Sequence, residues 1–366
     1  MTMADDKTDL DALRQRLDQL DAELLDKVAE RQRLVAEIGR YKHARGRHLR
    51  DFARERVVLE QAAQRGEQLG LSRILTQGLM SLLIEHSLQH QEQRQLQQSA
   101  SGSGRQALVI GGHGRMGRWF ADYLHIQGYA VTVADPAAAE TPYPWVADWR
   151  QAPLNADLLV VAAPMAISAV ILDELAAYQP SGVVFDLGSL KMPLAPALQR
   201  LIAAGVQATS LHPLFGPDVR MLSGRHVAVV DMGCAAANRV AHQLFAGTMA
   251  EVIELNASEH DRLMAYVLSC SHFLNIVFTQ VLAQSDETTL RRLSSTTFAR
   301  QLAIARDIAA ENALVYYEIQ RLNPYAADVR QQLATVLAQL DDLLQADQRE
   351  DFYRVLEQNR RYFDAG

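Results

Sequence analysis

The stretch Ala107-Leu-Val-Ile-Gly-Gly-His-Gly-Arg-Met-Gly117 decides the fold of the middle of this chain. Its apolar start is typical of a buried strand, its glycines at 112, 114 and 117 form GxGxxG, and residues 118–126 have a helical pattern. In such a motif one glycine permits a tight turn, one lets the backbone approach a pyrophosphate, and one lets the helix pack closely on the strand. The order strand, glycine turn, helix predicts a dinucleotide-binding unit.

An acid follows the second strand of this unit. Residues 129–134 form another strand-like run, and Asp135 comes directly after it. A carboxylate there would accept hydrogen bonds from ribose hydroxyls and repel a 2′-phosphate, which favours NAD over NADP. The alternative is a glycine-rich turn in an unrelated α/β domain. The residues expected at the cofactor are Gly112, Gly114, Arg115, Met116, Gly117 and Asp135.

Apolar runs and helical patterns alternate through the middle of the chain. Further strands are predicted at residues 158–163, 183–187, 227–230 and 252–255. This alternation predicts an α/β doubly wound parallel sheet, a Rossmann domain, which we place at residues 106–256. Ser258-Glu259-His260-Asp261 is similar to a helix-capping sequence, and residues 257–366 are predicted to form an all-α domain.

The N-terminal region has the pattern of an all-helical unit. Apolar residues at three- and four-residue steps predict one long helix over residues 8–42, and shorter helices follow at about 50–65 and 72–91. A long amphipathic helix cannot bury its own apolar face, so we expect a second copy of the chain to cover it. Residues 92–105, EQRQLQQSASGSGR, are typical of a flexible linker. We place the helical domain at 1–95 and the linker at 96–105.

The composition narrows the class of protein. A chain of 366 residues has room for about two or three domains with their own cores. The two cysteines, and the lack of a leader or of an apolar run of membrane-spanning length, predict a cytoplasmic protein without a membrane anchor. A net charge of −7 argues against general nucleic-acid binding, so small-molecule substrates are expected. No metal site is predicted.

Two cations interrupt the apolar seam of the long helix. Arg31 and Lys42 stand where the seam predicts apolar residues, and Arg14 flanks it. A buried charge is costly unless an anion meets it. These cations therefore predict a polar pocket for an anion, whereas the alternative is a coiled coil whose long cations reach water. Polar residues of the two following helices would complete the pocket: Arg50, Asp51, Arg54, Glu55, Ser87 and Gln91.

Without Arg50, these residues resemble in type and spacing the active site of the all-helical chorismate mutase family: Arg14, Arg31, Lys42, Asp51, Arg54, Glu55, Ser87 and Gln91. The resemblance implies rearrangement of chorismate to prephenate by holding the reactive conformer and stabilising charge on the ether oxygen. By the same resemblance, the carboxylates are bound by Arg31 and by Arg14 of a second subunit, with help from Arg54 and Ser87. Lys42 and Gln91 would donate to the ether oxygen. Glu55 would accept from the ring hydroxyl, and Asp51 would lie at the substrate.

Motifs of the second half resemble prephenate dehydrogenase. In chain order they are Asp157–Pro164, Asp186–Lys191, Leu211–Pro217, Glu259–Asp261 and Ser271–Phe273. Together the halves resemble the bifunctional chorismate mutase/prephenate dehydrogenases (T-proteins) of tyrosine biosynthesis. The resemblance implies oxidative decarboxylation of prephenate with NAD to 4-hydroxyphenylpyruvate, CO2 and NADH. It also implies a homodimer and tyrosine as feedback inhibitor.

The resemblance suggests roles for dehydrogenase residues. His212, expected in a loop after a strand, is the candidate base for the substrate hydroxyl, because an imidazole titrates near neutrality. Ser189 would orient the same hydroxyl or the nicotinamide, and His272 would lie near the substrate unless it is a core histidine. Arg306 would bind the ring carboxylate. Arg300 remains an alternative, since the family's Asp-Pro after this arginine is replaced here by Glu311-Asn312.

Three rival interpretations remain open. The first is a prephenate or arogenate dehydrogenase whose mutase-like domain is vestigial or regulatory. The second is a hydroxy-acid or imine dehydrogenase whose N-terminal region serves only for oligomerisation. The third is a sensor that binds a dinucleotide and an aromatic metabolite without catalysis, which NADH formation from substrate would exclude.

Overall fold

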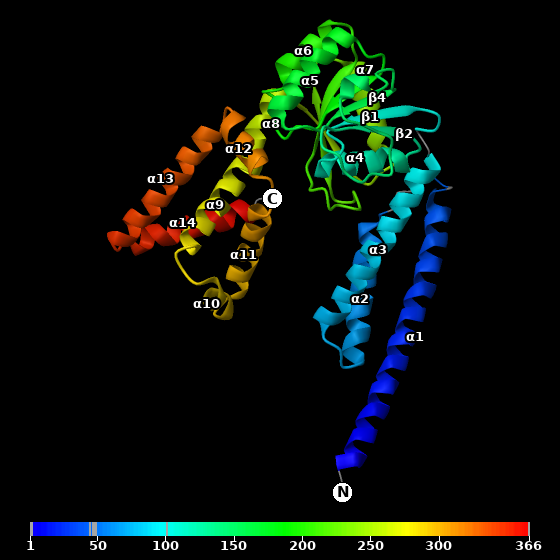
Figure 1. The fold of residues 1–366 in the computed structure, drawn as a ribbon. Coiled ribbons are helices and arrows are strands. Elements are labelled where there is room, and N and C mark those ends of the chain that lie inside the picture. The colour runs from blue at the N-terminus through cyan, green and yellow to red at the C-terminus, as the bar shows by residue number, and fades with distance from the viewer. Residues whose placement is uncertain (1–2, 44, 46–49, 100–101, 365–366) are drawn as a thin grey trace.

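The computed structural model describes residues 3–43, 45, 50–99 and 102–364. Three bodies follow one another along the chain: N-terminal helices, a central sheet covered by helices, and C-terminal helices (Figure 1). The predicted domain ends at residues 1 and 366, and residues 100–101 of the predicted linker, lie outside the described residues.

The N-terminal body consists of three helices, α1 (Met3–His43), α2 (Phe52–Gln68) and α3 (Arg73–Ser99). Helix α3 packs against both α2 and α1. The N-terminal end of α1 extends beyond the other two helices (Figure 1), and the seam residues Leu10, Leu17 and Leu24 are about half exposed. The seam thus forms the helix that the sequence predicts and stays uncovered in a single chain.

The central body is built on an eight-stranded sheet with the order β3-β2-β1-β4-β5-β6-β7-β8. Its strands are β1 (Gln106–Ile110), β2 (Ala130–Ala134), β3 (Trp145–Val146), β4 (Leu158–Val161), β5 (Val183–Asp186), β6 (Ala208–Pro213), β7 (His226–Asp231) and β8 (Glu251–Asn256). All neighbours pair in parallel except β6 and β7. The doubly wound fold is confirmed, with this one antiparallel step. Residues 214–225 join β6 to β7 without the crossover helix that a parallel pair needs.

Helices cover both faces of the sheet. Helices α4 (Arg115–Ile126) and α7 (Ala235–Phe245) pack on one face, with Phe120 and Phe245 in that core. Helices α5 (Met165–Tyr178) and α6 (Ala195–Ala203) pack on the other. A short 3₁₀ turn at Trp149–Gln151 precedes β4.

The predicted flexible linker is wrong for residues 92–99, because α3 continues through Ser99. Leu96 is buried in the core of the central body. The Glu92 carboxylate, 3% exposed, accepts the backbone N–H groups of Leu222 and Met249 at 2.7 Å each. Residues 92 and 96 lie one turn apart on one helix face, and their burial against the central body keeps this polar segment helical.

The C-terminal body is helical, as predicted. Its elements are α8 (Ala257–Met264), a π-helical turn (Ala265–Cys270), α9 (Ser271–Leu282), α10 (Glu287–Arg292), α11 (Thr296–Ala309), α12 (Ala313–Leu322), α13 (Ala326–Gln345) and α14 (Arg349–Asp364). The side chain of Asn256 caps α8 by accepting the N–H of Glu259 at 2.9 Å, two residues before the predicted cap. Residues 257–282 form a helix long and apolar enough to cross a membrane. We interpret it as a packing helix, since it contacts α11 and α13.

Candidate active sites

The glycine-rich turn lies where β1 meets α4, and two of its glycines have no room for a side chain. A Cβ on Gly117 would lie 2.1 Å from the carbonyl oxygen of Gly111, and one on Gly112 would lie 2.5 Å from Cγ1 of Val133. Gly111 itself has φ +83°, which L side chains rarely adopt. The turn sits at the carboxyl end of β1 beside β4, where strand order reverses and such sheets bind ligands.

Asp135 ends β2 beside this turn. Its carboxylate accepts the backbone N–H of His113 at 3.1 Å and that of Ala137 at 2.9 Å. Gly114 is the N-cap of α4, and Met116, in its first turn, is partly buried. Arg115 points away toward other elements, forming ion pairs with Asp218 at 2.9 Å and Glu311 at 2.6 Å.

His212 lies within β6, so its predicted place in a loop is wrong. It is 5% exposed, and its Nδ1 is 2.9 Å from Nε2 of His260. Nδ1 of His260 is in turn 2.8 Å from Oδ1 of the buried Asp261. Burial lowers the pKa of His212 well below its ordinary value, so the ring is neutral at physiological pH.

A buried lysine completes this polar cluster. Lys191 donates from Nζ to Oδ2 of Asp186 at 2.9 Å and to the carbonyl oxygen of Leu211 at 2.7 Å. Burial lowers the pKa of Lys191, against the opposing effect of Asp186. Ser189 is partly exposed in the same loop after β5. Both Lys191 and the His260-Asp261 pair belong to the sequence motifs, but the sequence gives no reason to expect them beside His212.

The candidate site residues of the C-terminal body contact other residues than this cluster. The His272 ring on α9 meets the ring of Tyr316 at 4.3 Å, and its buried Nδ1 has no partner among the described residues. Burial lowers the pKa of His272 to about 4. Arg306 on α11 forms an exposed ion pair with Glu287 at 3.1 Å, and Arg300 on the same helix is exposed. The single chain therefore does not join either arginine to His212.

In the N-terminal body the structure brings several predicted residues together. Arg31 donates to Oγ of Ser87 at 3.0 Å and to the carbonyl oxygen of Leu83 at 3.2 Å. One turn later, Nε2 of Gln91 donates to the carbonyl oxygen of Val35 at 2.8 Å. Ser87 and Gln91 are almost fully buried. Polar groups of α1 and α3 therefore meet at this helix contact.

Other predicted mutase residues have different partners. Asp51 caps α2 by accepting the N–H of Arg54 at 2.9 Å, while the Arg54 side chain is exposed. Glu55 forms a two-pronged ion pair with Arg50, both contacts at 3.1 Å. Lys42 is partly exposed near the end of α1. Arg14 is exposed, and among the described residues it pairs with Asp11 on its own helix at 3.3 Å and not with Arg31.

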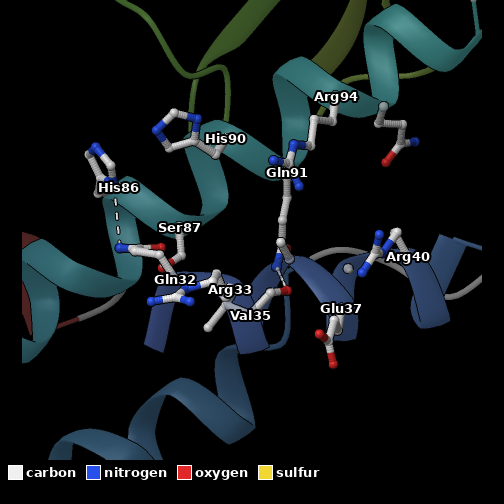
Figure 2. Close-up of a pocket in the computed structure, with 13 residues that line it drawn as sticks. Gln32, Arg33, Val35, Glu37, Arg40, His86, Ser87, His90, Gln91 and Arg94 are labelled. Atoms are coloured by element: carbon white, nitrogen blue, oxygen red, sulfur yellow. Dashed lines mark hydrogen bonds between the residues drawn. The ribbon is translucent and has the colours of Figure 1, made fainter. Parts of the chain in front are cut away.

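A cavity of about 420 Å³ opens between α1 and α3 around Ser87 and Gln91 (Figure 2). Cations come from both helices, and a single acid faces them. The lining includes Arg33, Glu37, Arg40, His86, His90 and Arg94. Figure 2 shows Gln91 reaching from α3 to Val35 on α1, with Arg94 and Arg40 on the facing helices. Its size and charge suit a small anion.

Comparisons with known proteins find a match in each of the three bodies. Residues 13–92 match chorismate mutase type II, residues 144–232 the nucleotide-binding domain of prephenate dehydrogenase, and residues 256–358 its dimerization domain. The T-protein of Enterobacter agglomerans is 27% identical over 320 residues, 85% of this chain and 81% of the relative. A 4-amino-4-deoxyprephenate dehydrogenase of Streptomyces pristinaespiralis is 33% identical over 258 residues, 67% of this chain and 86% of the relative.

Solved structures agree with this fold. A prephenate dehydrogenase from A. aeolicus, in complex with hydroxyphenyl propionate and NAD+, matches with a TM-score of 0.59 at 16% identity, over 72% of this chain and 99% of that one. Synechocystis arogenate dehydrogenase matches with a TM-score of 0.54 at 14% identity, over 71% and 99%. With a mutase domain before both dehydrogenase domains, this chain belongs to the bifunctional chorismate mutase/prephenate dehydrogenase family of tyrosine biosynthesis.

Proposed function

We propose that the N-terminal helices convert chorismate to prephenate and that the rest of the chain oxidises prephenate with NAD to 4-hydroxyphenylpyruvate, CO2 and NADH. The observation that carries the second step is the neutral, buried His212 on β6, two strands from β4 in a sheet whose β1–α4 turn is shaped for a dinucleotide. The Arg31–Ser87 contact beside Gln91 supports the first step.

The cofactor site fits NAD in three respects. Gly112 and Gly114 in the turn between β1 and α4 carry no Cβ that would keep a pyrophosphate away from the backbone, and a Cβ on Gly112 or Gly117 would clash. The N–H groups of the first turn of α4 suit the pyrophosphate charge. Asp135 would accept hydrogen bonds from the ribose hydroxyls, and its charge would disfavour a 2′-phosphate. When bound, NAD accepts the hydride.

In the dehydrogenase half, His212 would accept the proton of the C4 hydroxyl as hydride leaves C4. The bond from the ring to the carboxylate then breaks and CO2 departs. The electron pair of that bond stays in the ring and makes it aromatic. Because burial keeps His212 neutral, its ring is available as an acceptor at neutral pH. Ser189 would orient the same hydroxyl, His272 would lie near the substrate, and Arg306 or Arg300 would bind the ring carboxylate.

In the mutase half, Arg31 and Ser87 would hold a carboxylate of chorismate, with Arg54 and Asp51 at the substrate. Lys42 and Gln91 would donate to the ether oxygen as charge develops there, and Glu55 would accept from the ring hydroxyl. Gln91 donates from a neutral amide, so this contact needs no protonation step. For Gln91 and Glu55 to reach substrate, each would exchange a present partner, Val35 or Arg50.

A homodimer is part of this proposal. A second copy packed along α1 would bury the exposed leucine seam. It would also bring the exposed Arg14 of one chain into the mutase site of the other. The match of residues 256–358 to a dimerization domain supports a second contact. We also propose a cytoplasmic enzyme inhibited by tyrosine.

Absorbance of NADH tests the function directly. Purified protein receives either chorismate plus NAD or prephenate plus NAD. NADH from both substrates is the expected result. NADH from prephenate alone would favour a dehydrogenase with a vestigial or regulatory mutase domain, and arogenate in a third reaction would reveal the preferred dehydrogenase substrate. No NADH from any of them would refute the proposed function.

A further inference from the structure

A buried chain of hydrogen bonds runs from Asp261 through His260 to His212. The distances are 2.8 Å from Oδ1 of Asp261 to Nδ1 of His260, and 2.9 Å from Nε2 of His260 to Nδ1 of His212. All three residues are at most 5% exposed. Bulk water therefore does not compete for these hydrogen bonds.

The direction of this chain follows from its Asp261 end. Oδ1 of Asp261 accepts the backbone N–H of Lys191 at 2.8 Å, and Oδ2 accepts that of Met192 at 2.9 Å. Because both oxygens of Asp261 accept N–H groups, Nδ1 of His260 is the donor in the contact with Oδ1. Burial lowers the pKa of His260 despite the opposing effect of Asp261, so this ring is neutral and its Nε2 is an acceptor.

The second histidine inherits its tautomer from the first. Since Nε2 of His260 accepts, Nδ1 of His212 must carry a proton and donate it. The ring of His212 is neutral, so its Nε2 has a lone pair. Within the described part of the chain, Nε2 of His212 makes no hydrogen bond, and this atom is not fully buried.

Both ends of the chain are held in place. Lys191, besides fixing Asp261 through its backbone, donates from Nζ to the carbonyl oxygen of Leu211, the residue before His212. Nδ2 of Asn323 donates to the carbonyl oxygen of Asp261 at 2.8 Å. Two other charged groups act on His260, Lys191 and Asp186, and they form an ion pair with each other.

We propose that His260 and Asp261 are positioning residues for prephenate oxidation, which keep the proton of His212 on Nδ1 and leave Nε2 to accept the proton of the substrate hydroxyl. This inference rests on the proposed function of His212. The hydroxyl proton moves to Nε2 while hydride leaves C4 for NAD and CO2 is released, and the product phenol oxygen afterwards recovers the proton.

The first test is the ¹⁵N spectrum of histidine-labelled full-length enzyme, with His212 assigned by comparison with His212→Asn. The expected spectrum has the proton of His212 on Nδ1 at pH 7. A proton on Nε2 would overturn the proposal. The spectrum does not depend on turnover, so it tests the tautomer of His212 separately from the enzymatic function. The function itself is refuted if wild-type enzyme forms no NADH from prephenate.

The second test compares matched variants at His260. In His260→Gln the amide oxygen still accepts from Nδ1 of His212, whereas His260→Phe offers no acceptor. The expected kcat for prephenate oxidation falls by about 1,000-fold in the Phe variant and by less than about tenfold in the Gln variant, with KM for prephenate nearly unchanged. Wild-type kcat in the Phe variant, or equal losses in both, would overturn the proposal.

Asp261→Asn provides an independent variant. Its amide has one acceptor oxygen where the carboxylate has two, so an NH2 group faces either His260 or the N–H of Met192. If it faces His260, the chain reverses and Nε2 of His212 becomes protonated, as when an amide replaces the aspartate of a serine-protease triad. We expect a fall in kcat similar to that of the Phe variant and the Nε2–H tautomer in the spectrum. Unchanged kcat together with the Nε2–H tautomer of His212 would contradict the proposal, and an unchanged melting temperature verifies that each variant is folded.

Discussion

Glu92 fixes helix α3 to the central body, and its removal should loosen the whole N-terminal unit. Its carboxylate is 3% exposed and accepts two backbone N–H groups, those of Leu222 and Met249, at 2.7 Å. Glu92→Ala leaves both donors without a protein partner. At about 2 kcal/mol for each, the expected loss of stability is about 4 kcal/mol.

A loss of this size is measurable by thermal unfolding. For a unit of about 100 residues it corresponds to a melting temperature lower by about 20 °C. Trp119 fluorescence reports on the contact, because its Nε1 donates to the carbonyl oxygen of Val219 in the loop that carries Leu222. Glu85→Ala is the matched control, since Glu85 is an exposed acid on the same helix. A shift below about 2 °C in Glu92→Ala, or equal shifts in both variants, would refute the anchoring role.

Four further outcomes are expected. Lys42→Ala should abolish chorismate rearrangement and leave prephenate oxidation intact in separate assays, and equal loss of both would contradict the assignment of Lys42 to the mutase. His212→Asn should lower the hydride-transfer rate by about 100- to 10,000-fold with little change in prephenate affinity by calorimetry; an unaffected rate would exclude His212 as the base. Gly117→Ala should abolish NAD binding in calorimetry, because its Cβ would lie 2.1 Å from the carbonyl oxygen of Gly111, and retained affinity would contradict the packing argument. The folded pKa of His272, about 4, lies below its unfolded value of 6.5, so its neutral form contributes stability above pH 6.5 that is lost as pH falls toward 4. His272→Phe should therefore make the melting temperature less dependent on pH between 4 and 6.5. An unchanged dependence would refute this.

The sequence alone predicts those helices, strands and turns whose conformation depends on residues close to them in the chain. The strand, glycine turn and helix around residues 107–126 follow from backbone sterics and apolar periodicity, which act within a few residues. The seam of α1 has the same origin. The order of motifs was also sufficient to identify the family, because motif order is a property of the chain alone.

Only the tertiary structure decided which distant groups meet. The polar segment at residues 92–99 is typical of a linker, yet it stays helical because it packs on the central body. Leu96 is buried in that core, and the Glu92 carboxylate accepts N–H groups of Leu222 and Met249, which are more than 100 residues away in the chain. His212 was predicted from its motif, whereas its contact with His260 depends on how β6 and α8 pack. Tautomers and pKa shifts arise from burial and from such contacts, and neither is encoded in local spacing.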